Sequence, residues 1–174
     1  MAVTTDNVKL GVCDVTFNSV DLGATKGGVE VEIQTETYEV KVDQYGETPI
    51  KDVIIGTMVT VKVPMAESDL VKLKEVMPQA VALVDGMSAT KGLEIRSGVN
   101  TDLLDGAAEL VLHPTGLSAL DLSQDFTVFL AAPTANFTFK YATGEERIYE
   151  VTFKGYPDVA NNGKIAAFGD PSPV

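Results

Sequence analysis

The chain has 174 residues, of which 45% are hydrophobic, and its 25 acidic and 13 basic side chains give a formal net charge of −12. This length is enough for one domain with a substantial core. Such an acidic surface argues against a duplex-binding protein, because nucleic-acid binders need a basic footprint. No stretch approaches the roughly 18 apolar residues of a membrane-spanning helix, so we expect no membrane insertion.

Apolar and polar residues alternate in two segments near the start of the chain, as they do in half-buried strands. The first segment is Val12–Phe17. A turn-forming stretch, Asp21–Gly28, separates it from the second segment, Val29–Ile33. In that second strand Val29, Val31 and Ile33 are predicted to face inward, and Glu30 and Glu32 to face solvent.

Two further alternating segments, Tyr38–Val42 and Val59–Val63, enclose a longer connection at residues 44–56. Connections longer than about 12–15 residues are usually functional or disordered. This one is too apolar to be disordered. We interpret it as an arm that projects between two strands and buries its apolar tip against another copy of the protein. The candidate contact residues are Tyr45, Pro49, Ile50, Val53, Ile54 and Ile55.

After these strands, the apolar residues recur at the spacing of a helix. Leu70, Leu73 and Met77 lie three or four residues apart, which predicts one amphipathic helix over Ser68–Met77. Ser68 is the expected N-cap. This helix is expected to cover one face or edge of the sheet system.

The rest of the chain reads as β-structure joined by turns. Short strands are predicted around Ala80–Val84, Leu93–Ile95, Leu110–Leu112 and Phe126–Leu130. A hairpin of Phe137–Tyr141 and Arg147–Phe153, a short strand at Lys164–Phe168 and a C-terminal tail at residues 169–174 follow. We therefore expect one domain over residues 1–174. Its fold class is mainly β, with two packed antiparallel sheets in a β-sandwich or barrel-like arrangement, one flanking helix and the arm.

Catalytic and metal-binding patterns are weak. Cys13 lies in a predicted strand, where a small buried thiol is the simpler interpretation. His113 is the single histidine, so no acid–histidine–nucleophile set can be assembled from spacing. The aspartates lack the spacing of a calcium-binding loop and suit turns; they are Asp102, Asp105, Asp121 and Asp125. We expect a protein that is not an enzyme and that has no cofactor and no metal.

Several segments, taken in order, carry a resemblance to a known family. They are LGATKGGVEVEI, YEVKVDQYGETPIKD and IGTMVTVKVPMAE around the arm, ELVLHP at Glu109–Pro114, RIYEVTFKGYPD at Arg147–Asp158 and GKIAAFGDP at Gly163–Pro171. In this order and spacing, over most of its length, the chain resembles the tail tube (major tail) proteins of long-tailed, non-contractile bacteriophages.

The resemblance implies a structural virion protein of the tail tube, made and assembled in the cytoplasm of a bacterial host. Hexameric rings would stack into a hollow tube, strands of neighbouring subunits would form one continuous barrel around the channel, and the arm would reach the next ring. Double-stranded DNA would pass through without tight binding. The other implied partners are the tape-measure, tail-tip and terminator proteins.

Acidic side chains suit such a channel, because a wall with few cations offers DNA little counterion release. The candidate lumen-facing charges are Glu30, Glu32, Glu39, Lys41, Asp43 and Lys62.

Two alternative functions remain. A related tube or adaptor protein, such as a type VI secretion-like tube or a tail terminator ring, would share the fold, and the length of the polymer would distinguish it. A sugar-binding module or small hydrolase is disfavoured, because the chain has no tryptophan for stacking on sugars and no nucleophile–base pair.

Overall fold

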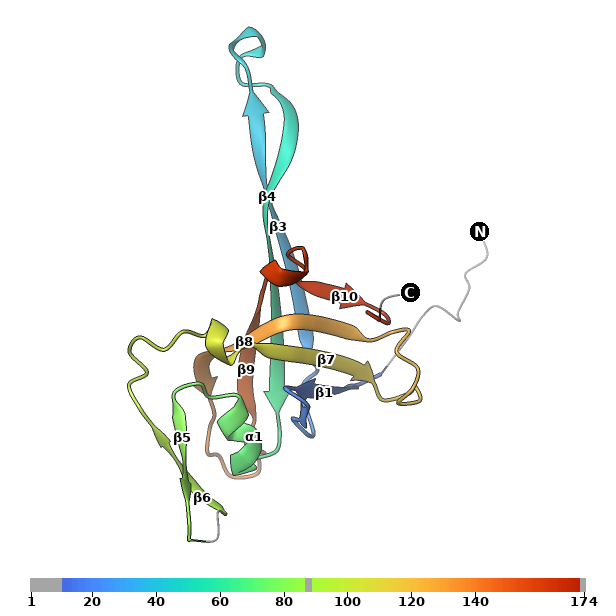
Figure 1. Ribbon diagram of the computed structural model, residues 1–174. Coiled ribbons are helices and arrows are strands. Elements are labelled where there is room, and N and C mark those ends of the chain that lie inside the picture. Colours follow the sequence, from blue (N-terminus) through green and yellow to red (C-terminus); the bar gives the residue numbers. More distant parts are fainter. Residues whose placement is uncertain (1–10, 87–88, 173–174) are drawn as a thin grey trace.

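A computed structural model describes residues 11–86 and 89–172, and within them the chain is mainly β, with one large antiparallel sheet, a small second sheet and one α-helix (Figure 1). This confirms the predicted fold class. The strands are β1 (Cys13–Phe17), β2 (Val20–Asp21), β3 (Glu30–Lys41), β4 (Pro49–Met65), β5 (Ala80–Val84), β6 (Thr90–Ile95), β7 (Ala108–Pro114), β8 (Phe126–Thr138), β9 (Tyr149–Tyr156) and β10 (Ala166–Phe168). The helix is α1 (Leu70–Glu75), and the 3₁₀ turns are η2 (Asp43–Tyr45), η3 (Leu104–Gly106) and η4 (Val159–Asn161).

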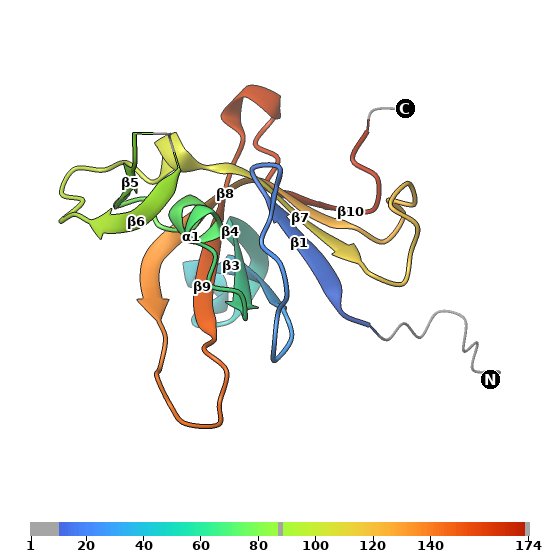
Figure 2. The same cartoon turned by 90° about the horizontal axis from the view of Figure 1, so that it is seen from below.

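The large sheet has the order β2-β1-β7-β8-β9-β4-β3, and β10 pairs with β8 outside this path. Strand β8 belongs to both halves of the sheet. It pairs with β7 between Phe126 and Ala131 and with β9 between Leu130 and Thr138. Where β9 has ended, β10 pairs with the first residues of β8. The two packed layers expected from the sequence are therefore halves of one continuous, bent sheet, seen end-on in Figure 2.

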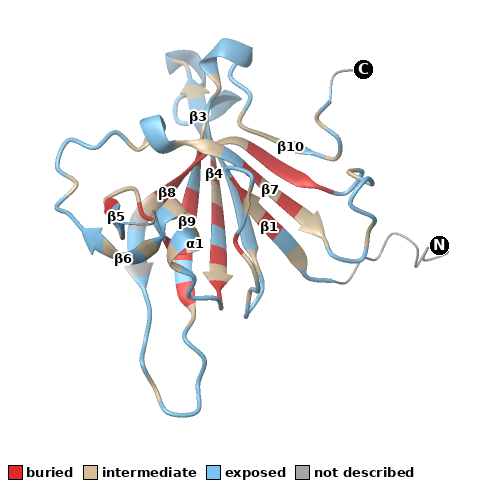
Figure 3. Ribbon diagram, turned by 60° about the horizontal axis from the view of Figure 1, so that its bottom comes forward, coloured by how far each residue is buried: buried red, intermediate tan, exposed pale blue. Residues whose placement is uncertain are grey.

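The core fills the space between these halves. The rings of Phe17 on β1 and Phe153 on β9 lie 4.9 Å apart between centroids, and both side chains are buried. Strand β9 alternates strictly: Tyr149, Val151 and Phe153 are buried, while the residues between them are more exposed. Figure 3 shows the buried residues along the strands of the body, including the second half of β4, and mostly exposed residues over the projecting end of the β3–β4 hairpin. This pattern follows from the period of a strand with one covered face.

The β3–β4 hairpin is longer than the sequence indicated. Its strands pair from Glu30 opposite Lys62 to Lys41 opposite Pro49. The predicted loop over residues 44–56 has the wrong boundaries, because residues 49–56 belong to β4 and the connection covers only residues 42–48. β-Branched side chains favour a paired strand over an open loop, and pairing satisfies the backbone donors and acceptors.

Helix α1 is shorter than predicted and has a different cap. It covers Leu70–Glu75, and Asp69 is its N-cap, with the Asp69 carboxylate accepting a hydrogen bond of 2.8 Å from the backbone N–H of Val71. The predicted cap, Ser68, is therefore wrong by one residue. Leu73 is buried against the core, as the helical spacing predicted.

We expect Asp69→Ala to lower the free energy of unfolding by about 1 kcal/mol, the usual cost of an N-cap. Chemical denaturation followed by circular dichroism measures this. Ser68→Ala is the matched control and should be neutral, because Ser68 is exposed and lies outside the cap position. A larger loss for Ser68→Ala than for Asp69→Ala would contradict the assignment.

In the last third of the chain, the observed strand boundaries also differ from the predicted ones. The sequence predicted separate strands at Phe126–Leu130 and Phe137–Tyr141, but β8 runs without a break to Thr138. A register shift against β9 between Pro133 and Phe137 accommodates the proline. Residues 139–148 are the connection to β9. The final strand is Ala166–Phe168, shorter than the predicted Lys164–Phe168. Residues 1–10 of the predicted domain and 173–174 of the predicted tail lie outside the described residues.

Candidate assembly surfaces

Strands β8, β9, β4 and β3 form a four-stranded panel with one face toward the core. Cross-strand pairs fix its outer face, since directly opposed residues point to the same side. Glu30 lies opposite Lys62, and Lys62 in turn lies opposite Thr152. The residues on this outer face are Glu30, Glu32, Thr60, Lys62, Pro64, Leu130, Ala132, Thr138, Glu150, Thr152, Lys154 and Tyr156. Most of them are acids, lysines and threonines, and the large apolar side chains are the opposed pair Leu130 and Tyr156.

Both margins of the panel lack a strand partner among the described residues. Strand β3 pairs with β4 on one side and with no strand on the other. The second half of β8, residues 132–138, pairs with β9 but lies beyond its ladder with β7. A long unpaired strand edge is a site for pairing with another chain.

The core-side face of β3 is also uncovered. Val31 and Ile33 lie opposite Val61 and Val59 of the core, so they point inward as predicted. Pointing inward does not bury them: Val31 and Ile33 are 37% and 46% exposed, whereas Val61 is 1% exposed. Within the described part of the chain no strand lies beyond β3, and its two inward-pointing side chains are only partly covered. Two apolar side chains on an open margin suit a contact with a second copy.

The arm is the part of the hairpin beyond the body, residues 34–58. Strand β9 pairs with β4 only from Val59 onward, so residues 49–58 of β4 pair with β3 alone within the described part of the chain. At about 3.3 Å per residue these residues extend roughly 30 Å. Figure 1 shows the arm standing clear of the body.

Every predicted contact residue lies on this arm. Tyr45 is in turn η2 at the tip and Pro49 begins β4. The exposed fractions of Tyr45, Ile54 and Ile55 are 68%, 66% and 63%. Sequence reasoning missed Tyr38, which it assigned to a half-buried strand but which is 61% exposed opposite Val53.

These apolar side chains surround the arm and do not form a single stripe. Val53 shares a face with Tyr38, and Ile54 lies opposite Thr37 on the other face. Two register shifts leave Ile50 and Ile55 without a directly opposed residue. Such bulges turn and twist the strand. An arm with exposed apolar side chains on both faces suits insertion between surfaces.

The structure separates the six candidate lumen-facing charges into two groups. Glu30, Glu32 and Lys62 share the outer face of the panel, where the Lys62 ammonium lies 3.2 Å from the Glu30 carboxylate. The second group lies on the arm. Glu39 and Lys41 alternate onto the face of β3 opposite to that of Glu30 and Glu32. The Lys41 ammonium lies 2.9 Å from the Glu47 carboxylate. Asp43 is in turn η2. These six residues therefore do not form one wall within a subunit.

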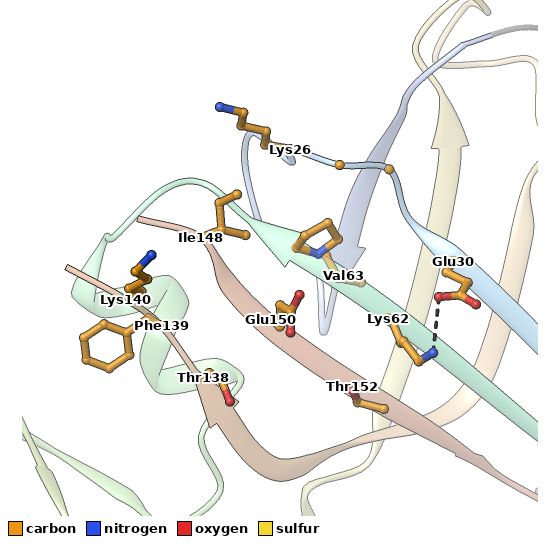
Figure 4. A pocket seen from close by; sticks show the side chains of 13 residues that line it. Lys26, Glu30, Lys62, Val63, Thr138, Phe139, Lys140, Ile148, Glu150 and Thr152 are labelled. Carbon is orange, nitrogen blue, oxygen red and sulfur yellow. Dashed lines mark hydrogen bonds and ion pairs between the residues drawn. The ribbon is translucent and has the colours of Figure 1, made fainter. Parts of the chain in front are cut away.

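An open cavity of about 860 Å³ lies at the foot of the hairpin, beside the outer face of the panel (Figure 4). Lys26, Lys62 and Lys140 reach it, but each is in an ion pair: Lys26 with Glu146, Lys62 with Glu30 and Lys140 with Glu145. Exposed pairs of this kind contribute little stability. No serine, cysteine or histidine is among the residues that line the cavity, and its paired charges do not make an anion site.

The chemically reactive residues lie elsewhere. Burial, and then the nearby Asp14 carboxylate, raises the pKa of the Cys13 thiol. Less thiolate is then present at neutral pH, which disfavours a nucleophilic role. The His113 imidazole Nδ1 lies 2.7 Å from the Asp125 carboxylate, and both side chains are largely buried. This pair links β7 to the segment before β8, and the Asp125 backbone carbonyl also accepts a hydrogen bond from Gly169.

Two of the four aspartates whose spacing matches no calcium-binding loop have local backbone partners in the structure. The Asp102 and Asp121 carboxylates accept hydrogen bonds from the backbone N–H groups of Leu104 and Ser123, two residues ahead of each. Within residues 11–86 and 89–172, no group of three or more acidic, histidine or cysteine side chains is arranged to hold a metal ion. No helix in the same residues is long and apolar enough to cross a membrane.

Comparisons with known proteins identify no relative. No protein-family model matches the chain, and no curated protein matches it significantly. The strand margins and the arm are therefore the features on which a function can be based.

Proposed function

We propose that this chain is a structural subunit that assembles into stacked hexameric rings, forming a hollow phage tail tube through which double-stranded DNA passes. The observation that carries the proposal is the open β3 margin. It combines a 12-residue strand that has no strand partner on its outer edge, the exposed apolar side chains of Val31 and Ile33, and the projecting arm. A single copy leaves all three incomplete, and neighbouring copies can complete them.

Ring closure follows from the two margins of the panel. If β3 of one subunit pairs with the second half of β8 in the next, each panel adds four strands to a continuous barrel. A closed barrel removes every exposed edge, which an open sheet cannot do. The contact uses two different surfaces, so it is head-to-tail and generates a ring when the rotation closes.

In this barrel the outer face of the panel becomes the channel wall. Glu30, Glu32 and Glu150 would then face the lumen together with Lys62 and Lys154, and the large apolar side chains on this face would be Leu130 and Tyr156. Lys62 is already paired with Glu30, which leaves less positive charge to attract phosphates. At physiological salt the screening length is about 8 Å, so the wall repels DNA only at short range.

Electron microscopy of the concentrated protein tests the proposal. We expect hollow tubes of uniform diameter with a ring repeat along the axis. A single ring that does not elongate would favour a terminator-like adaptor. A strictly monomeric chain at high concentration would overturn the proposal, because the strand margins and the arm would then have no partner.

Reversing the charge of the channel wall should change how tubes treat DNA. We expect tubes of the Glu30→Lys/Glu32→Lys variant to retain duplex DNA at low salt and to release it as salt rises, because lysines exchange condensed counterions for phosphate contacts. Wild-type tubes should retain none. Co-sedimentation of labelled DNA with the tubes measures the retention.

The control is Glu109→Lys/Glu145→Lys, which makes the same change in charge on two exposed residues outside the outer face of the panel. This variant should behave like the wild type. Equal retention by both variants would mean that overall charge, and not the panel face, governs DNA binding.

A further inference from the structure

The small sheet and the arm lie at opposite ends of the molecule. Figure 1 shows the arm at one end and strands β5 and β6, beside α1, at the other. Figure 2, viewed from the end that carries β5 and β6, shows the arm behind the body. The arm of a subunit therefore cannot contact its own β5–β6 hairpin, but a copy displaced along the long axis brings the two together.

The β5–β6 hairpin has an incomplete apolar surface. Val81, Leu83, Val84 and Ile95 are 38%, 47%, 61% and 66% exposed. Val81 and Leu83 lie on one face of the hairpin and Val84 and Ile95 on the other, and the four together are called the hairpin patch. Gly92 lies opposite Leu83 and contributes no side chain to cover it. Isolated two-stranded sheets are marginally stable in water, and this one packs on the body through α1. A partner that covers the hairpin patch would stabilise it.

Charge favours the arm as that partner. The arm has a net charge of −3, from the acids Glu36, Glu39, Asp43, Glu47 and Asp52 and the lysines Lys41 and Lys51. The segment from α1 to β6, residues 69–96, is balanced, with the acids Asp69, Glu75, Asp85 and Glu94 and the bases Lys72, Lys74, Lys91 and Arg96. In a chain of net charge −12, an acidic arm meets less repulsion at this segment than at the acidic remainder.

We propose that the hairpin patch is the docking surface for the arm of a second copy of this chain in the adjacent ring. The inference depends on the proposed stacking of rings and specifies which surface receives the arm. Apolar side chains that are exposed on both partners, Ile54 and Ile55 on the arm and Leu83 and Val84 on the hairpin, become buried together. Because the two surfaces differ and lie at opposite ends, the contact repeats without closing and extends the tube.

The first experiment compares two apolar-to-acid substitutions. We expect Leu83→Asp to raise the protein concentration needed for tube formation by about tenfold or more, as for a hot-spot residue in an interface. Leu120→Asp is the matched control, because Leu120 is 92% exposed and lies outside both the arm and the hairpin, and it should polymerise like the wild type. Leu83→Ser serves as a milder second variant if Leu83→Asp does not fold, as judged by thermal melting.

A mixing experiment tests the pairing directly. A chain with the Leu83→Asp substitution keeps its arm, and a chain without the arm keeps its hairpin patch. At a concentration just sufficient for wild-type tubes, neither should form tubes alone, but together they should form a complex of limited length in sedimentation. Tubes formed normally by Leu83→Asp and Leu83→Ser, while the wild type also polymerises, would overturn this inference and leave the proposed function intact. A monomeric wild type would instead overturn the proposed function, and this inference with it.

Cross-linking provides a readout that does not depend on tube length. In a Cys13→Ser chain, Ile54→Cys combined with Leu83→Cys should give a ladder of disulfide-linked multimers under mild oxidation. Ile54→Cys combined with Leu120→Cys should not. A ladder from the control pair of equal strength, or no ladder from the first pair in assembled tubes, would contradict docking at the hairpin patch.

Discussion

A variant in which residues 37–55 are replaced by Asn-Gly should fold normally and form no tubes. Glu36 and Gly56 are directly opposed in the hairpin, and a two-residue Asn-Gly turn is the favoured way to join such a pair. The excised residues make no contribution to the buried core. Their removal deletes most of the exposed apolar surface of the arm, including Tyr38, Tyr45 and Ile54. Circular dichroism melting measures the fold, and electron microscopy and sedimentation measure assembly.

The control for this variant keeps the arm and changes one methylene. Ile54→Val preserves both the strand and most of the apolar surface, so tubes should still form. Two results would count against the division between body and arm. Loss of the cooperative melting transition in the excised variant would mean that the core needs the arm, and tubes of normal length would mean that stacking does not need it.

Phe153→Ala should lower the free energy of unfolding by about 3–5 kcal/mol, the cost of removing a large buried side chain. The Phe153 side chain is fully buried, and its ring packs against Phe17 across the core. Domains of this size have a total stability of about 5–15 kcal/mol. The variant should therefore be partly unfolded at moderate temperature, and urea denaturation measures the loss.

The control is Phe168→Ala, which removes the same side chain from an exposed position on β10. The Phe168 ring lies 4.7 Å from the Phe126 ring, but Phe168 is 77% exposed. We expect a loss of about 1 kcal/mol, the scale of one aromatic pair. Similar losses at the two positions would contradict the assignment of the core to the space between the two halves of the sheet.

Hydrophobic alternation predicted the strands that have one covered face and one solvated face. Strand β9 is the clearest case, because Tyr149, Val151 and Phe153 are buried and the residues between them are not. The position of the helix was also predicted, because Leu70 and Leu73 recur at helical spacing. Its cap was not, since Ser68 and Asp69 are both good N-cap residues and backbone geometry selects Asp69.

The sequence predicted the location of the arm correctly but not its secondary structure. The sequence identified an apolar projection between two strands, but interpreted Gln44–Gly56 as a loop. Alternation also assigned Tyr38 and Ile33 to a buried face. Ile33 is exposed because β3 is the last strand of the sheet, and Tyr38 is exposed because it lies on the arm, beyond the strands of the body. The alternation of apolar and polar residues along a strand indicates which way each side chain points, but it does not indicate whether another layer covers that side chain.

The sequence by itself determined the β-rich class, the direction in which side chains of the central strands point and the apolar character of the projecting segment, because these depend on residues close together in the chain. Only the tertiary structure decided that β3 ends the sheet, that the panel charges separate from those of the arm, and that the arm and the β5–β6 hairpin lie at opposite ends. These features depend on pairing between strands far apart in sequence, such as β4 with β9 and β1 with β7. Local periodicity specifies an orientation for each strand and does not specify its neighbours.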